Sequence, residues 1–133
     1  MAYTTINNPS AYSTITLYTG NGQDNRAVTN SASAGNFKPD WLWIKERSST
    51  SSHRLFDTSR GASKRIESDT NLAEATDTSN QKSFDTNGFT LGTSGSVNAN
   101  NDTYVAWQWK ANGGTAVTNN DGSHASSVQV NTT

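Results

Sequence analysis

The chain has no cysteine, little charge and little proline, and it lacks a long apolar run. Without cysteine, disulfides, thiolate catalysis and zinc–sulfur sites are excluded. The formal net charge is −1, from 10 basic and 11 acidic residues, and nucleic acid binding favours a basic excess. No apolar run approaches the roughly 18 residues of a membrane helix. We therefore expect one domain that uses neither nucleic acid nor membrane insertion.

Small polar residues dominate what is present. Serine, threonine and asparagine number 18, 19 and 16, which is 53 of the 133 residues. The charged fraction is only 16%, unlike the high net charge that marks disordered chains. Threonine favours strands, and asparagine, serine and glycine favour turns. We therefore expect an all-β protein with a thin core, which neighbouring chains help to stabilise.

Three segments alternate with the period of a strand. In the strand that begins at Tyr12, Ile15 and Leu17 share one face. The segment 37–47 has apolar residues on both faces over its central four positions, which predicts an interior strand covered on both sides, with 53–57 as its hairpin partner. The segment 103–110 places Val105, Trp107 and Trp109 on one face and Tyr104, Ala106 and Gln108 on the other.

Weaker signals mark the remaining segments. Asn87-Gly88 between apolar residues predicts a hairpin, because both residue types tolerate φ > 0. Residues 23–36 fit a weak edge strand or a loop, and 92–102 a loop. Asp69 followed by helix-forming residues predicts one or two helical turns over 69–75. Short strands are also possible at 65–67 and 127–130.

Two Trp-x-Trp pairs are the strongest candidate for a binding site: Trp41 with Trp43, and Trp107 with Trp109. Each indole offers on the order of 200 Å² of surface, so an exposed pair could form a platform for sugar rings. The alternative is that the indoles fill the core between two sheets. The second interpretation is favoured, because both pairs lie in the middle of strands and the chain is poor in other large apolar residues.

Other candidate sites give weaker signals. The segments 98–102 and 119–122 carry oxygen ligands that calcium could use, but neither has the spacing of an EF-hand loop. Arg54, Asp57 and Arg60 could bind an anion, or form an ion pair that fixes a turn, which we favour. No carboxylate pair or nucleophile motif indicates catalysis, so we expect no catalytic residue, no cofactor and no metal.

Four blocks in succession resemble a module of marine bacteriophage virion proteins, found in tail-fibre and other surface polypeptides. They are Phe37-Lys38-Pro39-Asp40-Trp41-Leu42-Trp43-Ile44-Lys45, Leu55-Phe56-Asp57 with Arg60-Gly61-Ala62, Ser83-Phe84-Asp85 with Asn87-Gly88-Phe89-Thr90-Leu91-Gly92, and Thr103-Tyr104-Val105-Ala106-Trp107-Gln108-Trp109-Lys110-Ala111. The resemblance implies an antiparallel β-sandwich of the jelly-roll or concanavalin-like type, without catalytic residues.

These observations lead to one expected organisation and two expected functions. An N-terminal arm over 1–11 precedes a β-sandwich over 12–110, and a polar arm or linker follows over 111–133. The expected function is a non-enzymatic virion structural protein, as a tail-fibre subunit or capsid-surface decoration, located on the virion surface after assembly in the host cytoplasm. Its expected partners are copies of itself and other virion proteins. The alternative is a carbohydrate-binding module for host surface glycans.

Overall fold

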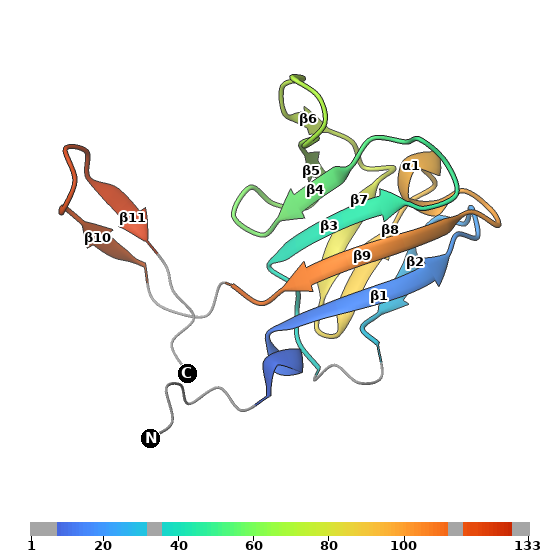
Figure 1. The fold of residues 1–133 in the computed structure, drawn as a ribbon, viewed down its shortest axis with the longest axis horizontal. Helices are drawn as coiled ribbons and strands as arrows, with labels where there is room; N and C mark the ends of the chain where they lie inside the picture. Colours follow the sequence, from blue (N-terminus) through green and yellow to red (C-terminus); the bar gives the residue numbers. More distant parts are fainter. Residues whose placement is uncertain (1–7, 32–35, 112–115, 129–133) are drawn as a thin grey trace.

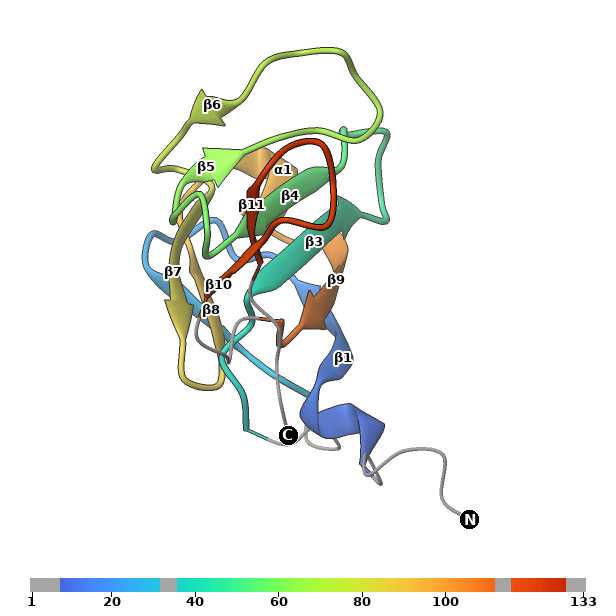
Figure 2. The same cartoon turned by 90° about the vertical axis from the view of Figure 1, so that its left-hand side faces the viewer.

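The computed structural model describes residues 8–31, 36–111 and 116–128. In this part of the chain, two antiparallel sheets pack face to face as a β-sandwich (Figures 1 and 2). The four-stranded sheet has the order β1 (Ser13–Thr19), β9 (Thr103–Trp109), β3 (Trp41–Glu46), β4 (Arg54–Asp57). The three-stranded sheet has the order β2 (Arg26–Thr29), β8 (Gly88–Leu91), β7 (Gln81–Asp85). The expected all-β sandwich is confirmed.

The core lies between these two sheets. Strand alternation sends Leu42 and Ile44 of β3 inward, beside Tyr104 and Ala106 of β9. The three-stranded sheet and the helix α1 (Gly95–Asn98) complete the packing. The buried cluster comprises Val28, Leu42, Ile44, Phe56, Phe89, Leu91, Val97, Tyr104 and Ala106.

Most strand predictions are confirmed by the pairing. β3 is interior in its sheet, between β9 and β4, and the predicted hairpin of 37–47 with 53–57 is present, although its first strand begins only at Trp41. β2 is the predicted edge strand, and β7 and β8 form the predicted hairpin. The turn between β7 and β8 ends at Gly88, which has a φ of 129°. A Cβ at this position would lie 2.1 Å from the carbonyl oxygen of Val28, so the close approach of β2 requires glycine.

The segment between β4 and β7 differs from prediction. The helix expected over 69–75 is absent; instead β5 (Lys64–Arg65) pairs with β6 (Ala75–Thr76). A helix of one or two turns has little stability of its own, and tertiary bonds to Asp69 and Glu74 compete with it. The short helix α1 lies in the predicted loop 92–102. No helix in the described part of the chain is long and apolar enough to cross a membrane.

Both ends of the sandwich carry small elements. The N-terminal arm forms a 3₁₀ turn, η1 (Pro9–Ala11), while residues 1–7 of the arm lie outside the described part. After β9, β10 (Val117–Asn119) and β11 (Ser126–Val128) form a hairpin that projects beyond the end of β9 (Figure 1). The strand expected over 127–130 therefore begins one residue earlier, and residues 129 and 130 are not described.

Candidate functional site

The four indoles lie on the side of the four-stranded sheet that is turned away from the three-stranded sheet, and not between the two sheets. In β3 the burial alternates, with Leu42 and Ile44 fully buried but Trp41 exposed and Trp43 half-buried. In β9 the inward residues are Tyr104, Ala106 and Gln108, and Trp107 and Trp109 are half-buried on the opposite face. The preferred core interpretation of the indoles is therefore wrong, and so is the expectation that β3 is covered on both sides.

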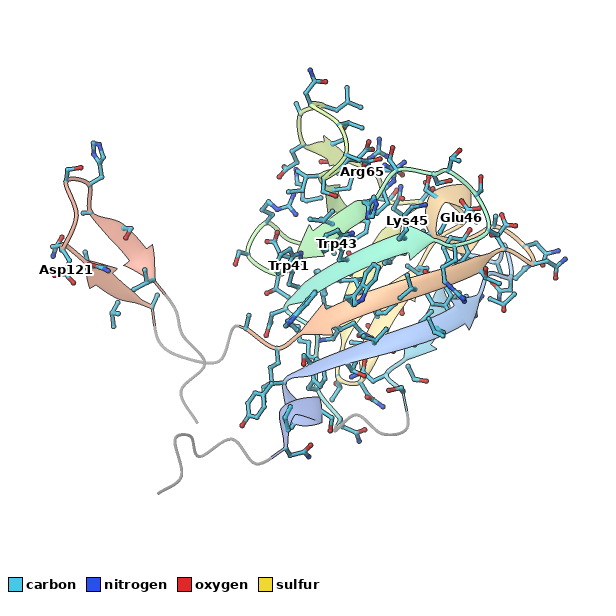
Figure 3. All side chains as sticks on the ribbon, viewed as in Figure 1. Trp41, Trp43, Lys45, Glu46, Arg65 and Asp121 are labelled. Carbon is cyan, nitrogen blue, oxygen red and sulfur yellow. The ribbon has the colours of Figure 1, made fainter. Side chains whose placement is uncertain are left out.

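The register of β3 and β9 assembles the indoles into one group. Trp41 is paired with Trp109, and Trp43 with Trp107, as direct neighbours across the two strands. The ring centroids are 5.2 Å apart in the first pair and 5.6 Å in the second, within the usual range for aromatic contacts. Trp41 and Trp43 follow each other along β3 (Figure 3). Each is in contact with an indole of β9, so the four rings make a contiguous aromatic surface.

The apolar surface continues across β9 onto β1. Ile15 is paired with Trp107, and Leu17 with Val105. Ile15 is 57% exposed, Leu17 62% and Trp41 40%. We call the indoles together with Ile15 and Leu17 the outer face; Val105 lies on the same side but is buried. Because large contiguous apolar patches on a protein surface are typical of interaction sites, the outer face is the candidate site of this chain.

Polar groups at the border of the outer face have partners within the chain. The indole Nε1 of Trp43 donates a 2.8 Å hydrogen bond to Nδ1 of His53. The ammonium of Lys45 donates to the backbone carbonyls of Glu46 and Ser49. Asp57, next to Trp41, forms an ion pair of 2.6 Å with Arg60. The outer face is therefore apolar at its centre, with its charged groups bound at the rim.

A cavity of about 510 Å³ lies at the Trp41 end of the outer face. Its lining includes Trp41, Asp40, Asp57 and Arg60 from the sandwich, and Ser127 from β11. Both carboxylates are held by hydrogen bonds, because Asp40 accepts from the hydroxyl of Thr58 and the backbone amide of Ala111, and Asp57 accepts from Arg60. The cavity combines one exposed indole with several polar groups.

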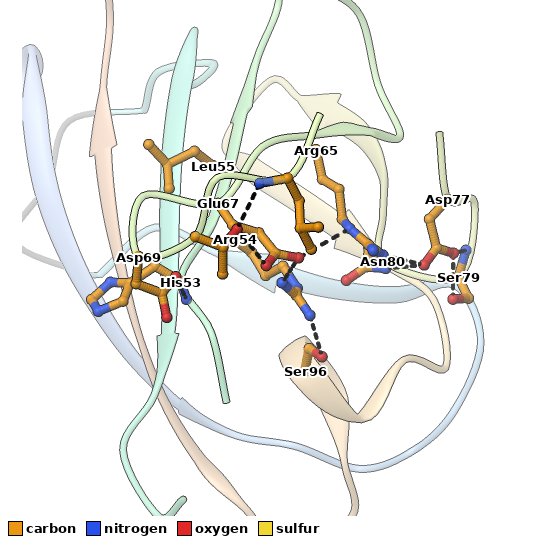
Figure 4. Close-up of polar contacts among 12 residues, drawn as sticks. His53, Arg54, Leu55, Arg65, Glu67, Asp69, Asp77, Ser79, Asn80 and Ser96 are labelled. Carbon is orange, nitrogen blue, oxygen red and sulfur yellow. Dashed lines mark hydrogen bonds and ion pairs between the residues drawn. The ribbon is translucent and has the colours of Figure 1, made fainter. Parts of the chain in front are cut away.

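The predicted charged cluster divides into two ion pairs. Asp57 and Arg60 pair with each other across a turn, which confirms the structural interpretation for these two residues. Arg54 is not part of that pair. Arg54 lies on the side of β4 opposite to Asp57. It binds Glu67 and donates a 3.0 Å hydrogen bond to the hydroxyl of Ser96 (Figure 4). Both members of the Arg54–Glu67 pair are mostly buried, so Arg54 ties the β5–β6 segment to β4 and α1.

A second polar cluster follows β6 (Figure 4). Asp77 accepts bonds from the backbone amide and the hydroxyl of Ser79, and it pairs with Arg65 at 2.8 Å. The hydrogen bond from Ser79 lowers the pKa of Asp77 below its usual value, against the smaller effect of burial. These contacts close the loop between β6 and β7, so this cluster has a structural role.

The candidate calcium segments are occupied by structural hydrogen bonds. The side-chain oxygen of Asn98 accepts from the backbone amide of Asn21 and from Arg26, and its amide donates to the carbonyls of Gln23 and Gly92. Asn98 is fully buried and links α1 to the β1–β2 loop. Segment 119–122 lies in the β10–β11 turn, and among the described residues no group of three acidic, histidine or cysteine side chains could hold a metal.

Two tyrosines join the core to α1. The hydroxyl of Tyr18 donates to the carbonyl of Val97 at 2.8 Å, and that of Tyr104 donates to the carbonyl of Gly95 at 2.6 Å. The rings stack with centroids 5.1 Å apart. Burial raises the pKa of Tyr104 to about 12 and the pKa of Tyr18 well above its usual value. These hydroxyls therefore stay protonated as structural donors.

Sequence reasoning missed the contribution of β1 to the outer face. The alternation placed Ile15 and Leu17 on one face and Thr16 and Tyr18 on the other, which is confirmed, but it left open which face is buried. The buried side is the polar one, because Thr16 accepts a bond from Gln108 and Tyr18 reaches Val97. Only the pairing of Ile15 with Trp107 shows that β1 extends the apolar surface, and the pattern within a single strand does not reveal which strands are paired.

Comparison with known proteins yields a family and no function. No curated protein and no solved structure matches the chain. One family model matches residues 8–133, which includes the sandwich, η1 and the β10–β11 hairpin, and it is described as a domain of unknown function, DUF7483. The chain belongs to the DUF7483 family.

Proposed function

We propose that this chain is a non-enzymatic structural protein of a bacteriophage virion, as a tail-fibre subunit or a capsid-surface decoration, that assembles with copies of itself. The observation that carries the proposal is the uncovered outer face. Its apolar side chains would be covered in an assembly, where a neighbouring subunit supplies the second layer. The resemblance of the four sequence blocks to phage surface modules supports the virion location.

The β10–β11 hairpin supports assembly independently. Most of its residues are exposed, including Val117, and a two-stranded hairpin is marginally stable alone in water. Contact with a neighbouring subunit would stabilise it. The absence of cysteine fits a particle that forms in the reducing host cytoplasm and is then released.

The mass of the full chain in solution tests self-assembly. We expect light scattering to give a multiple of 14.3 kDa at micromolar concentration. A mass of one chain over the whole concentration range would contradict the proposal. For the location, antibodies raised against the chain should label the surface of intact particles of a phage that encodes it. Labelling only after particles are disrupted would contradict a surface position.

A carbohydrate-binding module for host surface glycans is the second candidate. It is favoured by Trp41, which is exposed beside a cavity lined with carboxylates and a guanidinium that can form hydrogen bonds with sugar hydroxyls. A glycan array tests it with the wild type and with Trp41→Ala, and Leu72→Ala serves as a control at another exposed apolar residue. Signal that Trp41→Ala abolishes and Leu72→Ala retains would favour this candidate. Absence of signal would remove it.

A further inference from the structure

Among the described strands, β1 has the edge that is best suited to pair with a strand of another chain. β1 has only one neighbour among the described strands, β9. The carbonyl of Tyr12 accepts from the amide of Lys110, and the amide of Gly20 donates to the carbonyl of Asp102. Bonded pairs alternate along an antiparallel ladder, so the even-numbered residues of β1 bond β9. The amides and carbonyls of Ser13, Ile15, Leu17 and Thr19 therefore point away from the sheet.

β1 lacks the devices that protect sheet edges. Edge strands usually carry charged residues, proline or bulges that prevent pairing with another chain. Ser13–Thr19 has no charged residue and no proline, and it pairs with β9 through seven consecutive residues without a bulge. Its length of seven residues exceeds the mean strand. Nothing in this sequence discourages a further strand.

The other three sheet edges of the sandwich are protected. β4, at the opposite edge of the same sheet, carries Arg54 and Asp57 and is bridged by Ile66. β2 carries Arg26. β7 carries Lys82 and has a break in its register between Gln81 and Ser83. The contrast singles out β1 as the edge that the described part of the chain leaves open.

We propose that β1 pairs antiparallel with β1 of a second copy, about a two-fold axis at Thr16, so that two four-stranded sheets become one continuous sheet. This deepens the proposed self-assembly and names its surface. In this register Ser13 faces Thr19 of the second copy and Ile15 faces Leu17. All four outward-pointing residues then form bonded pairs, with about eight hydrogen bonds in total.

The side chains of β1 suit this symmetric register. About Thr16, the bonded pairs are of like kind, Ser13 with Thr19 and Ile15 with Leu17, while Thr14 faces Tyr18 on the other side of the sheet. An isologous contact requires such self-complementarity, because each residue meets its symmetry partner. On the outer face, Ile15 and Leu17 of the two copies form one apolar cluster that links the two groups of indoles. No like charges oppose each other, since β1 has none.

A charge placed at the edge tests the pairing. Leu17→Lys puts two ammonium groups beside the axis, and we expect it to raise the dimer dissociation constant roughly 100-fold. Leu72→Lys is the matched control, because Leu72 is equally exposed, at 64%, and lies in the loop before β6. Far-ultraviolet circular dichroism should show both variants folded. A Leu72→Lys mass like that of the wild type is expected.

Cross-linking tests the register. The chain has no cysteine, so single-cysteine variants give unambiguous products. In the proposed register, the Cα atom of Ile15 in one copy lies about 5.5 Å from the Cα atom of Leu17 in the second copy. This distance suits a disulfide. Mixing Ile15→Cys with Leu17→Cys should give a covalent heterodimer under mild oxidation. Mixing Leu17→Cys with Leu72→Cys should not.

The outcomes separate the surface from self-assembly. An assembled wild type with loss of assembly in Leu17→Lys and the expected cross-link supports the β1 pairing. If the wild type assembles, Leu17→Lys has the same mass as the wild type and no cross-link forms, the pairing through β1 is overturned. Self-assembly would then take place through another contact. A monomeric wild type overturns both.

Discussion

Trp41 and Trp109 face each other across β3 and β9 with ring centroids 5.2 Å apart, on the side of the sheet that is turned away from the core. Their immediate chain neighbours Leu42 and Gln108 are fully buried on the other side. The two faces of each of these strands therefore have different roles. The inner residues hold the two sheets together, and the indoles form a surface.

The adjacent residues Leu42 and Trp41 test this separation. Leu42→Ala leaves a cavity in the sandwich core and should lower the free energy of unfolding by about 2–5 kcal/mol. Trp41→Ala removes a ring that keeps 40% of its surface exposed and leaves no cavity between the sheets, so it should cost less than Leu42→Ala. Urea unfolding of the two variants measures the difference. Equal losses would contradict the outer position of Trp41.

Alternation in the sequence predicted the strands and their two faces, but not which face is buried. In β3 both faces are apolar, so the period alone cannot choose between Leu42 with Ile44 and Trp41 with Trp43. The choice comes from the opposing sheet, whose Phe89 and Leu91 fill the space between the layers. That packing partner is distant in sequence and is invisible to a pattern within one strand.

Local signals near polar residues were least reliable. Asp69 has the chemistry of a helix cap, but its carboxylate accepts from the amide of His53. Arg54 is near Asp57 in sequence, but it binds Glu67, 13 residues away. Helix propensity and sequence proximity describe one segment of the chain, whereas the partners of Asp69 and Arg54 come from other segments that the fold brings close. In contrast, Asp57 and Arg60 lie within one turn, and their ion pair was predicted correctly.

The buried pair of Arg54 and Glu67 should contribute strongly when only one partner is removed. Glu67→Gln leaves the buried guanidinium of Arg54 without its carboxylate, and we expect a loss of about 3–5 kcal/mol in unfolding free energy. Arg54→Met should cost less, because Glu67 keeps an ion pair of 3.5 Å with Arg65. The double variant should lose less than the sum of the two. The exposed pair of Lys82 and Asp24 is the control, where Lys82→Ala should cost at most about 1 kcal/mol. Additive losses would show that the pair is not coupled.

Two glycines with positive φ distinguish backbone strain from steric overlap. Gly61 has φ of 99° and open space where a Cβ would lie, so Gly61→Ala should cost only about 1–2 kcal/mol of strain. Gly88 has φ of 129°, and its Cβ would overlap the backbone of Val28 in β2. Gly88→Ala should therefore destabilise the chain more than Gly61→Ala, by thermal unfolding. The reverse order would contradict the close packing of β2 on β8.

The tyrosines under α1 should make the fold sensitive to alkaline pH. Because burial raises the pKa of Tyr104 to about 12 and that of Tyr18 above its usual value, the unfolded chain loses these protons first as the pH rises. Their contribution to stability is thus complete below about pH 10 and is lost as the pH rises from about 10 through 12.

Phenylalanine variants isolate this effect from the titration of other groups. Tyr18→Phe with Tyr104→Phe removes both hydroxyls, so the double variant should lose less stability than the wild type between pH 10 and 12. At neutral pH, Tyr104→Phe alone should cost about 1–3 kcal/mol, because the carbonyl of Gly95 and the amide of Ala99 lose their partner. Urea midpoints measured at each pH give both quantities. An identical alkaline slope for the double variant and the wild type would show that neither hydroxyl is held protonated by the fold.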